Sequence, residues 1–438
     1  MPTARVIGGG PAGLMAAEVL ARAGVDVTVH ERMPSPGRKF LLAGHGGLNL
    51  THTEDRENFI TRYGTSADRI APMLEQFGPE DLREWAADLG EPTFVGTSGR
   101  VFPQALRATP LFRAWLTRLA ELGVQTERRT TWSGWAHTQS SGADSLLITD
   151  ESGETHEVTS DITIFALGGA SWPHLGADGS WVGPFAERGI KVTPLEAANV
   201  GVRVEWSNVY ASRFAGTPLK NVSVTVGGGE PRRGEIMLTR SGVEGGLIYA
   251  LGAVIRESLK AEGRCVLEVD LRPEASVEEV ARRLSKRRPK DSATNWLRRA
   301  IGLDPASVGL LREASGGTLS HDATAMAALI KAVPVAVTGT MPIDRAISTA
   351  GGIAWGEVDD RLMLRRLPGT FVAGEMLDWE APTGGYLLQA SFSTGVAAAK
   401  GALAWLEDVK DRRPPLPGTT LQTTQPSPAP RSPADPGE

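Results

Sequence analysis

Glycines near the start of the chain have the spacing of a nucleotide-binding turn. Residues 8–13 read Gly-Gly-Gly-Pro-Ala-Gly and match the pattern G-x-G-x-x-G. In this pattern the first glycine permits a tight turn, the second lets the backbone approach a pyrophosphate, and the third allows a helix to pack closely on a strand. The N–H groups at the start of that helix would bind the phosphates. The contacts predicted here are Gly8, Gly10, Pro11, Ala12 and Gly13.

An acidic residue follows these glycines at the expected distance. The β-branched stretch 25–30 predicts a strand, and Glu31 ends it, where a carboxylate would accept hydrogen bonds from a ribose. Its charge would repel the extra phosphate of NADP, so FAD or NAD is favoured. The glycines alone could form an ordinary loop. Strand, helix and carboxylate together favour a dinucleotide site, which we extend to the neighbouring Arg32.

Segments farther along the chain favour FAD over NAD. Residues 37–39, Gly-Arg-Lys, supply two cations near the expected phosphates, and the glycine-rich loop 44–49 could approach a flat ring. The apolar runs 162–167 and 369–373 each predict a strand that ends in a glycine motif. A helix is predicted to begin directly after Gly384 and Gly385. The FAD contacts predicted in these segments are Arg38, Lys39, Gly47, Asn49, Ala166, Gly168, Gly374, Glu375, Asp378, Gly384, Gly385 and Tyr386.

Together these motifs resemble those of the BaiN/YhiN-like flavoproteins, a family also described as NAD(P)/FAD-dependent or aminoacetone-oxidase-like. The matching segments, in the family's order, are G-R-K at 37–39, G-R-V-F-P at 99–103, A-L-G-G-A-S-W-P at 166–173, A-G-E-M-L-D at 373–378 and G-G-Y-L-L-Q at 384–389. Where the family has Arg-Cys-Asn in its glycine-rich loop, residues 47–49 are Gly-Leu-Asn, which indicates a distinct subgroup.

The resemblance implies non-covalent FAD in an extended form. Its phosphates would lie at residues 8–13 and its ribityl chain near Asp378. The helix that follows Gly385 would direct its N-terminus at the pyrimidine end of the flavin, where the positive end of the helix dipole would stabilise the reduced ring.

Candidate catalytic residues are few. His45 and His52 flank the glycine-rich loop, and either could donate a proton near neutral pH. The alternative is that both only hydrogen-bond to the loop. The single cysteine, Cys265, lies in an alternating stretch that predicts a strand, so we expect it to be structural and predict no metal site.

The elements that must position these residues predict an α/β fold. Strand 4–7, helix 14–23 and strand 25–30 form a βαβ unit, which implies a parallel sheet. We predict a Rossmann-like FAD-binding domain of the glutathione-reductase type, built from residues 1–194 and 341–410. An inserted domain, 195–340, would be β-barrel-like over 195–272 and helical over 276–333. Residues 411–438, rich in Pro, Ser and Thr, are predicted to be a disordered tail.

These features predict an FAD-dependent oxidoreductase that transfers a hydride through the flavin to or from a small organic substrate. No second G-x-G-x-x-G follows a predicted strand, so NAD(P)H would act as a transient electron donor. An oxygen-using flavin amine oxidase is one alternative. A flavin-bearing RNA-associated protein is another, because residues 282–290 are strongly basic.

The charge and hydropathy of the chain limit the kinds of partner that it can have. The net charge of -5, and the acidic residues Glu278 and Glu279 beside the basic stretch, argue against a nucleic-acid partner. No apolar run reaches about 18 residues, so we expect no membrane span. The cysteine count and the lack of a recognisable signal peptide favour the cytoplasm. The pattern specifies neither the substrate nor the oligomeric state.

Overall fold

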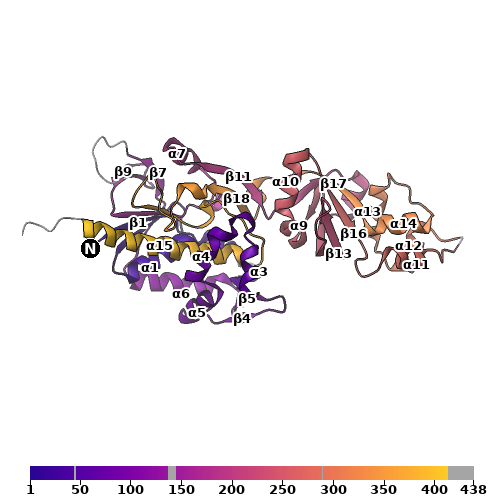
Figure 1. Ribbon diagram of the computed structural model, residues 1–438, viewed down its shortest axis with the longest axis horizontal. Coiled ribbons are helices and arrows are strands. Elements are labelled where there is room, and N and C mark those ends of the chain that lie inside the picture. Colours follow the sequence, from indigo (N-terminus) through magenta and orange to yellow (C-terminus); the bar gives the residue numbers. More distant parts are fainter. Residues whose placement is uncertain (44–45, 137–144, 289, 413–438) are drawn as a thin grey trace, which may run out of the picture.

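The computed structural model describes residues 1–43, 46–136, 145–288 and 290–412. Two lobes lie side by side along the long axis of the molecule, and a narrow waist joins them (Figure 1). One lobe contains the start and end of the described chain, and the other contains its middle. The predictions for His45 and for most of the C-terminal tail, residues 413–438, lie outside the described residues.

The first lobe is built on a parallel sheet of five strands in the order β19-β10-β1-β2-β6. Each neighbouring pair in it is parallel. The chain leaves β1 toward β2 on one side, while β10 lies on the other side of β1, so the direction of winding reverses there. Ligands of such sheets bind beyond the carboxyl ends of the strands at this reversal. The strands are β1 (Thr3–Ile7), β2 (Asp26–Glu31), β6 (Gln125–Arg128), β10 (Ile162–Phe165) and β19 (Thr370–Val372).

Two helices pack against each other beside this sheet. Helix α1 (Pro11–Arg22) begins at a proline, whose missing N–H has no partner to lose at that position. Helix α15 (Tyr386–Arg412) lies along it (Figure 1). A Cβ on Gly395 of α15 would lie 2.4 Å from the backbone oxygen of Ala12, so only glycine permits this approach. The contact places the beginning of α15 near the glycine turn.

Smaller elements cover the rest of this lobe. β3 (Thr51–His52), β5 (Arg100–Pro103) and β4 (Thr93–Val95) form an antiparallel sheet in that order. β7 (Thr131–Trp135), β8 (Leu146–Thr149) and β9 (Thr155–Val158) form another. The helices are α2 (Arg38–Ala43), α3 (Arg56–Thr61), α4 (Ala67–Gln76), α5 (Pro79–Asp88), α6 (Ala108–Glu121) and α7 (Val182–Glu187).

The second lobe contains a closed barrel with the strand order β12-β15-β14-β13-β16-β17. Its strands are β12 (Val202–Val204), β13 (Pro218–Val226), β14 (Arg232–Thr239), β15 (Gly242–Glu244), β16 (Cys265–Asp270) and β17 (Val333–Thr340). Its helices are α8 (Asn208–Phe214), α9 (Gly246–Ala250), α10 (Gly252–Glu262), α11 (Val277–Leu284), α12 (Ala293–Ile301), α13 (Pro305–Ala314) and α14 (Ala323–Lys331). A separate apolar core fills this lobe.

The predicted architecture is confirmed: a Rossmann-like α/β domain with a parallel sheet is interrupted by a closed barrel and helices. Cys265 is buried on β16, as its strand pattern predicts. The barrel differs in detail from the expected order of a β part followed by a helical part. Its last strand, β17, comes after helices α11–α14 and closes the barrel against β12.

The waist is a two-stranded antiparallel ribbon of β11 (Val192–Ala198) and β18 (Ser348–Ile353). The side chain of Arg256 on α10 contacts this ribbon: it donates one hydrogen bond to the backbone oxygen of Ala197 on β11 and another to Glu380. At the other end of the first lobe, α15 continues through residues 411 and 412, which the sequence pattern placed in the tail. Among the described residues, no helix combines the length and apolar character needed to cross a membrane.

Candidate functional site

A cavity of about 800 Å³ opens beyond the carboxyl ends of β1, β10 and β19. It runs from the glycine turn to the start of α15, at the position that the sheet topology favours for a ligand. All but three of the predicted FAD contacts line it: Gly8, Gly10, Pro11, Ala12, Glu31, Arg32, Arg38, Lys39, Gly47, Asn49, Ala166, Gly168, Gly374, Glu375, Gly384 and Gly385.

The three motif glycines differ in what surrounds them. Gly8 has a φ of +110°, and a Cβ there would lie 2.3 Å from the backbone oxygen of Ala166. A Cβ on Gly13 would lie 2.0 Å from the backbone oxygen of Gly8. A Cβ on Gly10 would meet no atom within 4 Å, so it would project into the cavity. Gly8 and Gly13 therefore serve the turn and the helix packing, while Gly10 leaves the space that a pyrophosphate needs.

The carboxylate of Glu31 holds the glycine turn in place. Its Oε2 accepts a hydrogen bond from the N–H of Gly9 at 2.9 Å, and its Oε1 accepts one from the N–H of Met33 at 2.7 Å. Burial raises the pKa of this carboxyl, and the two backbone donors oppose that rise. Arg32, on the cavity wall beside it, donates to Asp178 Oδ2 at 2.9 Å.

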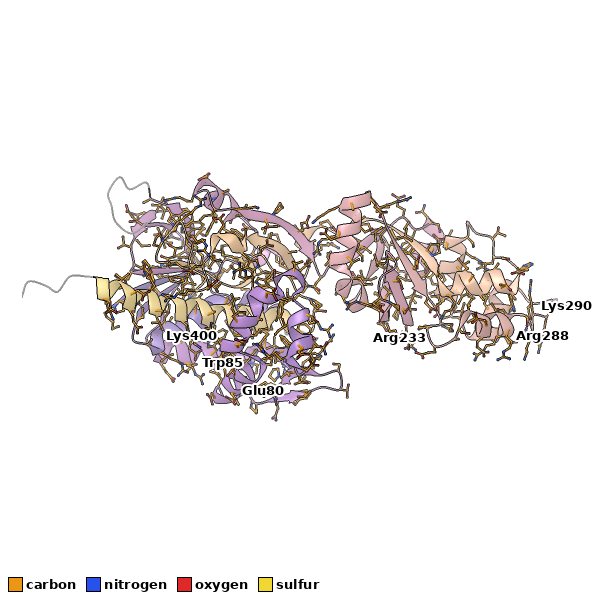
Figure 2. All side chains as sticks on the ribbon, viewed as in Figure 1. Glu80, Trp85, Arg233, Arg288, Lys290 and Lys400 are labelled. Carbon is orange, nitrogen blue, oxygen red and sulfur yellow. The ribbon has the colours of Figure 1, made fainter. Side chains whose placement is uncertain are left out.

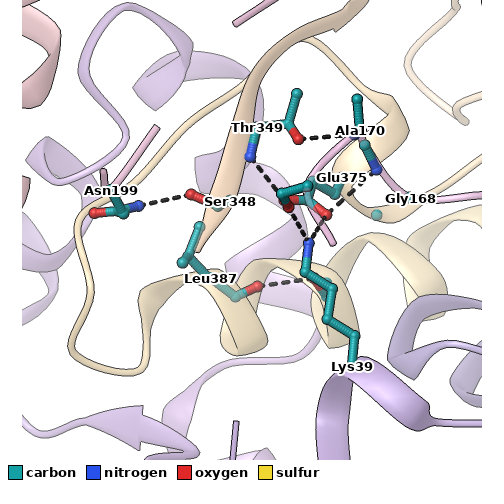
Figure 3. Close-up of polar contacts among 12 residues, drawn as sticks. Lys39, Gly168, Ala170, Asn199, Ser348, Thr349, Glu375 and Leu387 are labelled. Atoms are coloured by element: carbon teal, nitrogen blue, oxygen red, sulfur yellow. Dashed lines mark hydrogen bonds and ion pairs between the residues drawn. The ribbon is translucent and has the colours of Figure 1, made fainter. Parts of the chain in front are cut away.

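A partly buried ion pair joins distant motifs at the wall of the cavity (Figure 3). The ammonium of Lys39 donates to Glu375 Oε2 at 2.8 Å and to Ser171 Oγ at 2.6 Å. The same carboxylate accepts hydrogen bonds from the N–H groups of Thr349 and Gly169. This pair links α2 to the ends of β10 and β19, so it fixes the relative positions of three cavity walls.

Four residues of the cavity wall have a buried polar side-chain atom without a hydrogen-bond partner among the described residues, namely His30, Arg38, Asn49 and Trp132. Arg38 Nε and Asn49 Oδ1 are buried and have no hydrogen-bond partner among the described residues. Arg38 is also close enough to Glu31 to lower the pKa of that carboxyl. A cation beside a glycine turn that leaves open space at Gly10 is the donor set for a pyrophosphate. The residues present therefore fit a dinucleotide such as FAD.

The start of α15 forms the far end of the cavity. Gly384 and Gly385 line it with φ values of +130° and +103°, a conformation that favours glycine. A Cβ on Gly385 would lie 2.5 Å from the backbone carbon of Thr51, so the glycine also permits close packing on β3. Just before them, Thr383 lines the cavity and its N–H donates to Asn199 Oδ1.

The other three predicted contacts, Gly13, Asp378 and Tyr386, do not line the cavity. The hydroxyl of Tyr386 donates to Glu54 Oε1 at 2.6 Å, and burial raises the pKa of this phenol. Asp378 accepts from Thr193 Oγ1 at 2.6 Å. Gly13 supports helix packing, as described above. His52 does not line the cavity; its ring stacks on Tyr386, and its Nδ1 accepts from the N–H of Glu54.

The structure adds cavity residues that the sequence reasoning did not assign. Arg100 belongs to the G-R-V-F-P motif, so its place in a motif was the available signal. Thr383 precedes the second glycine pair. Trp172 and Trp379 also line the cavity. Ser348 comes from β18, and no local pattern in the sequence marked it.

Comparison with known proteins places this chain in a family. The family described as "HI0933-like protein Rossmann domain" matches residues 2–401. The chain is 26% identical over 412 residues to a 3-dehydro-bile acid delta(4,6)-reductase of Clostridium scindens, covering 91% of this chain and 98% of the relative. It is 25% identical over 411 residues to a ribosomal RNA dihydrouridine synthase of Escherichia coli, covering 91% and 97%.

Solved structures support the fold. A 3-ketosteroid delta1-dehydrogenase from Sterolibacterium denitrificans superposes with a TM-score of 0.53 at 14% identity, covering 92% of this chain and 100% of that one. The glycine turn, the cavity and the match over nearly the whole chain agree. The chain belongs to the HI0933-like Rossmann-domain family and is an FAD-dependent oxidoreductase.

Proposed function

We propose that this protein reduces a carbon–carbon double bond conjugated to a carbonyl group, with FAD bound non-covalently and NAD(P)H as a transient electron donor. The observation that carries the proposal is the single continuous cavity. It extends from the pyrophosphate-sized space at Gly10 to the glycine pair at the start of α15, so it has room for a cofactor along one part and a substrate beside it.

The names of the two relatives support this reaction class. A delta(4,6)-reductase acting on a 3-dehydro-bile acid adds hydrogen to double bonds that are conjugated to a ketone. A dihydrouridine synthase adds hydrogen to the double bond of a uracil ring, which also adjoins a carbonyl group. The two substrates differ greatly in shape, while the reaction is the same, so we carry over the reaction and not the substrate.

The residues of the cavity have separate tasks in this proposal. When bound, FAD supplies hydride transfer. The open face at Gly10 and the guanidinium of Arg38 would hold its pyrophosphate. The ion pair of Lys39 and Glu375 would fix the relative positions of the cavity walls around the cofactor. The N–H groups at the start of α15 would stabilise negative charge at that end of the cavity, and the apolar side chains of Leu387 and Leu388 would limit the entry of water.

Product analysis tests this function. The FAD-loaded protein is incubated anaerobically with NADPH or NADH and either a 3-oxo-Δ4 steroid or a uridine-containing oligoribonucleotide. We expect one substrate to gain the mass of two hydrogens, with one equivalent of reduced nicotinamide consumed. A parallel incubation in air with a panel of amines tests the amine oxidase alternative. Oxygen consumption with oxidation of an amine there, and no gain of hydrogen by either acceptor in the anaerobic incubation, would support that alternative instead.

A second candidate is reduction of a base within RNA. It is favoured by basic side chains at the outer tip of the barrel lobe, where Arg288 and Lys290 project (Figure 2). Lys286, Arg288 and Lys290 are exposed, and their side chains have no ion-pair partner within the described part of the chain. Arg282 and Arg283, by contrast, both pair with Glu279.

This tip is remote from the cavity, so only a large substrate could contact both. A gel shift with ribosomal RNA at increasing salt distinguishes the two candidates. Loss of the shift when Lys286, Arg288 and Lys290 are all changed to Gln would favour RNA, because phosphate contacts make binding salt-dependent. Equal turnover of a small enone by this triple variant and by the wild type would leave the small-molecule function in place.

A further inference from the structure

We propose that Arg100 is the anchor for an anionic group of the substrate, a carboxylate or a phosphate. This inference rests on the proposed function, because it names the substrate class of the same cavity. Arg100 lines the cavity and is exposed, and its guanidinium has no hydrogen-bond or ion-pair partner among the described residues. A guanidinium at a cavity wall is suited to bidentate recognition of an oxyanion.

The other charges of the cavity are already balanced. Arg32 pairs with Asp178, and Lys39 pairs with Glu375. Glu31 accepts hydrogen bonds from two backbone N–H groups. Only two cationic side chains of the wall lack an anionic hydrogen-bond or ion-pair partner in the described parts of the chain, namely Arg38 and Arg100. Two anions are therefore expected to bind in this cavity when it is in use.

The positions of these two arginines assign one anion to each. Arg38 starts α2, directly after Gly37, whose N–H donates to the backbone oxygen of Gly9 in the glycine turn. It therefore lies where the pyrophosphate of the cofactor is expected. Arg100 on β5 lies opposite His52 on β3 in the antiparallel sheet. Thr51, the neighbour of His52, packs on Gly385. It therefore lies toward the end of the cavity at which α15 starts.

The strand that carries Arg100 offers more than a charge. Arg100 and Phe102 are two residues apart on β5, so their side chains emerge from the same face. Phe94 on β4 pairs with Phe102, and their rings stack with centroids 5.8 Å apart. Phe94 is 39% exposed. Neither ring lines the cavity itself, but Phe102 lies beside Gly47, which does: a Cβ on Gly47 would be 3.8 Å from the Phe102 ring. An apolar face beside the cavity, next to an unpaired guanidinium, fits a substrate that has a flat apolar body and one anionic group.

Binding experiments with matched pairs of probes test this assignment. The FAD-loaded protein is titrated with crotonate and with the neutral crotonamide, and separately with uridine 5′-monophosphate and with uridine. The readout is the change in the flavin absorption spectrum, which does not depend on turnover. We expect at least one anion to bind roughly tenfold or more tightly than its neutral partner, since charge-assisted hydrogen bonds are of that strength.

The variant Arg100→Gln should remove this preference, and Arg100→Lys should keep part of it. Arg107→Gln is the matched control, because Arg107 is exposed, lies in the same segment and does not line the cavity. A preference in the first pair alone assigns a carboxylate, and one in the second pair alone assigns a phosphate.

Three results would overturn the proposal: no preference for either anion in the wild type, an unchanged preference in Arg100→Gln, or loss of FAD from Arg100→Gln. The last would make Arg100 a cofactor residue. Because none of these readouts requires reduction of a double bond, they can fail while the proposed reaction holds, and the reverse is also true.

Discussion

The ammonium of Lys39 and the carboxylate of Glu375 are 2.8 Å apart, although 336 residues separate them in the chain. This contact joins the Gly-Arg-Lys motif after the first βαβ unit to the Ala-Gly-Glu motif after the last strand of the sheet. Both residues also line the cavity. The two ends of the sequence therefore meet at the site through one partly buried ion pair.

The first prediction concerns this pair. Lys39→Met and Glu375→Gln should each weaken FAD binding by about tenfold, because each leaves a partly buried charged partner unsatisfied. The double variant should be little worse than either single variant, since the two changes remove the same interaction. FAD affinity measured for all four proteins gives the coupling. Changes that simply add would show that the pair does not act as a unit at the site.

The second prediction separates binding from folding at the glycine turn. Gly10→Val should abolish FAD binding while the FAD-free protein keeps its melting temperature, because the side chain enters open cavity. Gly13→Val should lower the melting temperature of the FAD-free protein, because its Cβ would collide with the backbone of Gly8. FAD content and thermal unfolding of both variants check this. Full FAD content in Gly10→Val would contradict the placement of the pyrophosphate.

The third prediction concerns His30, which is buried on β2 at the cavity wall. Burial lowers the pKa of its imidazole to about 4, and Arg5 adds to the effect, although Glu127 opposes it. The unfolded chain, with an ordinary pKa near 6.5, then binds the proton first as the pH falls. The contribution of the buried, neutral His30 to the free energy of unfolding is complete above pH ~6.5. It is lost progressively as the pH falls toward ~4.

At pH ~5 this loss amounts to about 2 kcal/mol of unfolding free energy. Urea unfolding of the FAD-free protein at pH ~7 and pH ~5 measures it. His30→Asn should lose about 2 kcal/mol less than the wild type between these two values. The same loss in both proteins would mean that other groups, and not His30, determine the acid sensitivity.

The fourth prediction concerns charge at the start of α15. A carboxylate placed here should oppose the negative charge that accompanies reduction. Gly385→Asp would be a poor choice, because its Cβ would meet the backbone of Thr51. Thr383 lines the cavity beside the glycine pair, so Thr383→Asp and the neutral Thr383→Asn form a matched pair.

We expect Thr383→Asp to have a flavin reduction potential roughly 20–40 mV below that of Thr383→Asn, or about 1–2 kcal/mol for a two-electron couple. An equilibrium dye titration of the two proteins measures the difference. Equal potentials with full FAD content would mean that the start of α15 does not face the flavin ring.

Local signals in the sequence predicted the parts of the fold that depend on neighbouring residues. The glycine turn, the strand that ends at Glu31 and the helix after Gly385 each have a recognisable pattern over a few residues, and the structure has all three elements. The closure of the barrel was harder to specify, because β12 pairs with β17 more than a hundred residues later. Hydropathy patterns contain no information about such pairing.

The same contrast between local sequence patterns and long-range packing applies to the residues of the site. Most cavity residues within recognised motifs could be assigned, whereas Arg100 was not, although it lies in the G-R-V-F-P motif, because an arginine on an exposed hairpin has the pattern of an ordinary surface cation. Tyr386 is predicted to contact the cofactor; it does not line the cavity, and its hydroxyl donates a hydrogen bond to Glu54. The sequence placed it next to the glycine pair but could not specify on which side of the helix its ring would pack.

The most direct test of the central claim is reoxidation of the reduced protein without oxygen. The FAD-loaded protein is reduced with one equivalent of dithionite and then mixed anaerobically with an α,β-unsaturated carbonyl compound, while recovery of the oxidised flavin spectrum is followed. We predict full recovery, with one equivalent of acceptor reduced at its carbon–carbon double bond, and no recovery with the saturated analogue. If no such acceptor reoxidises the reduced flavin, while air reoxidises it at once, the proposed reaction is wrong.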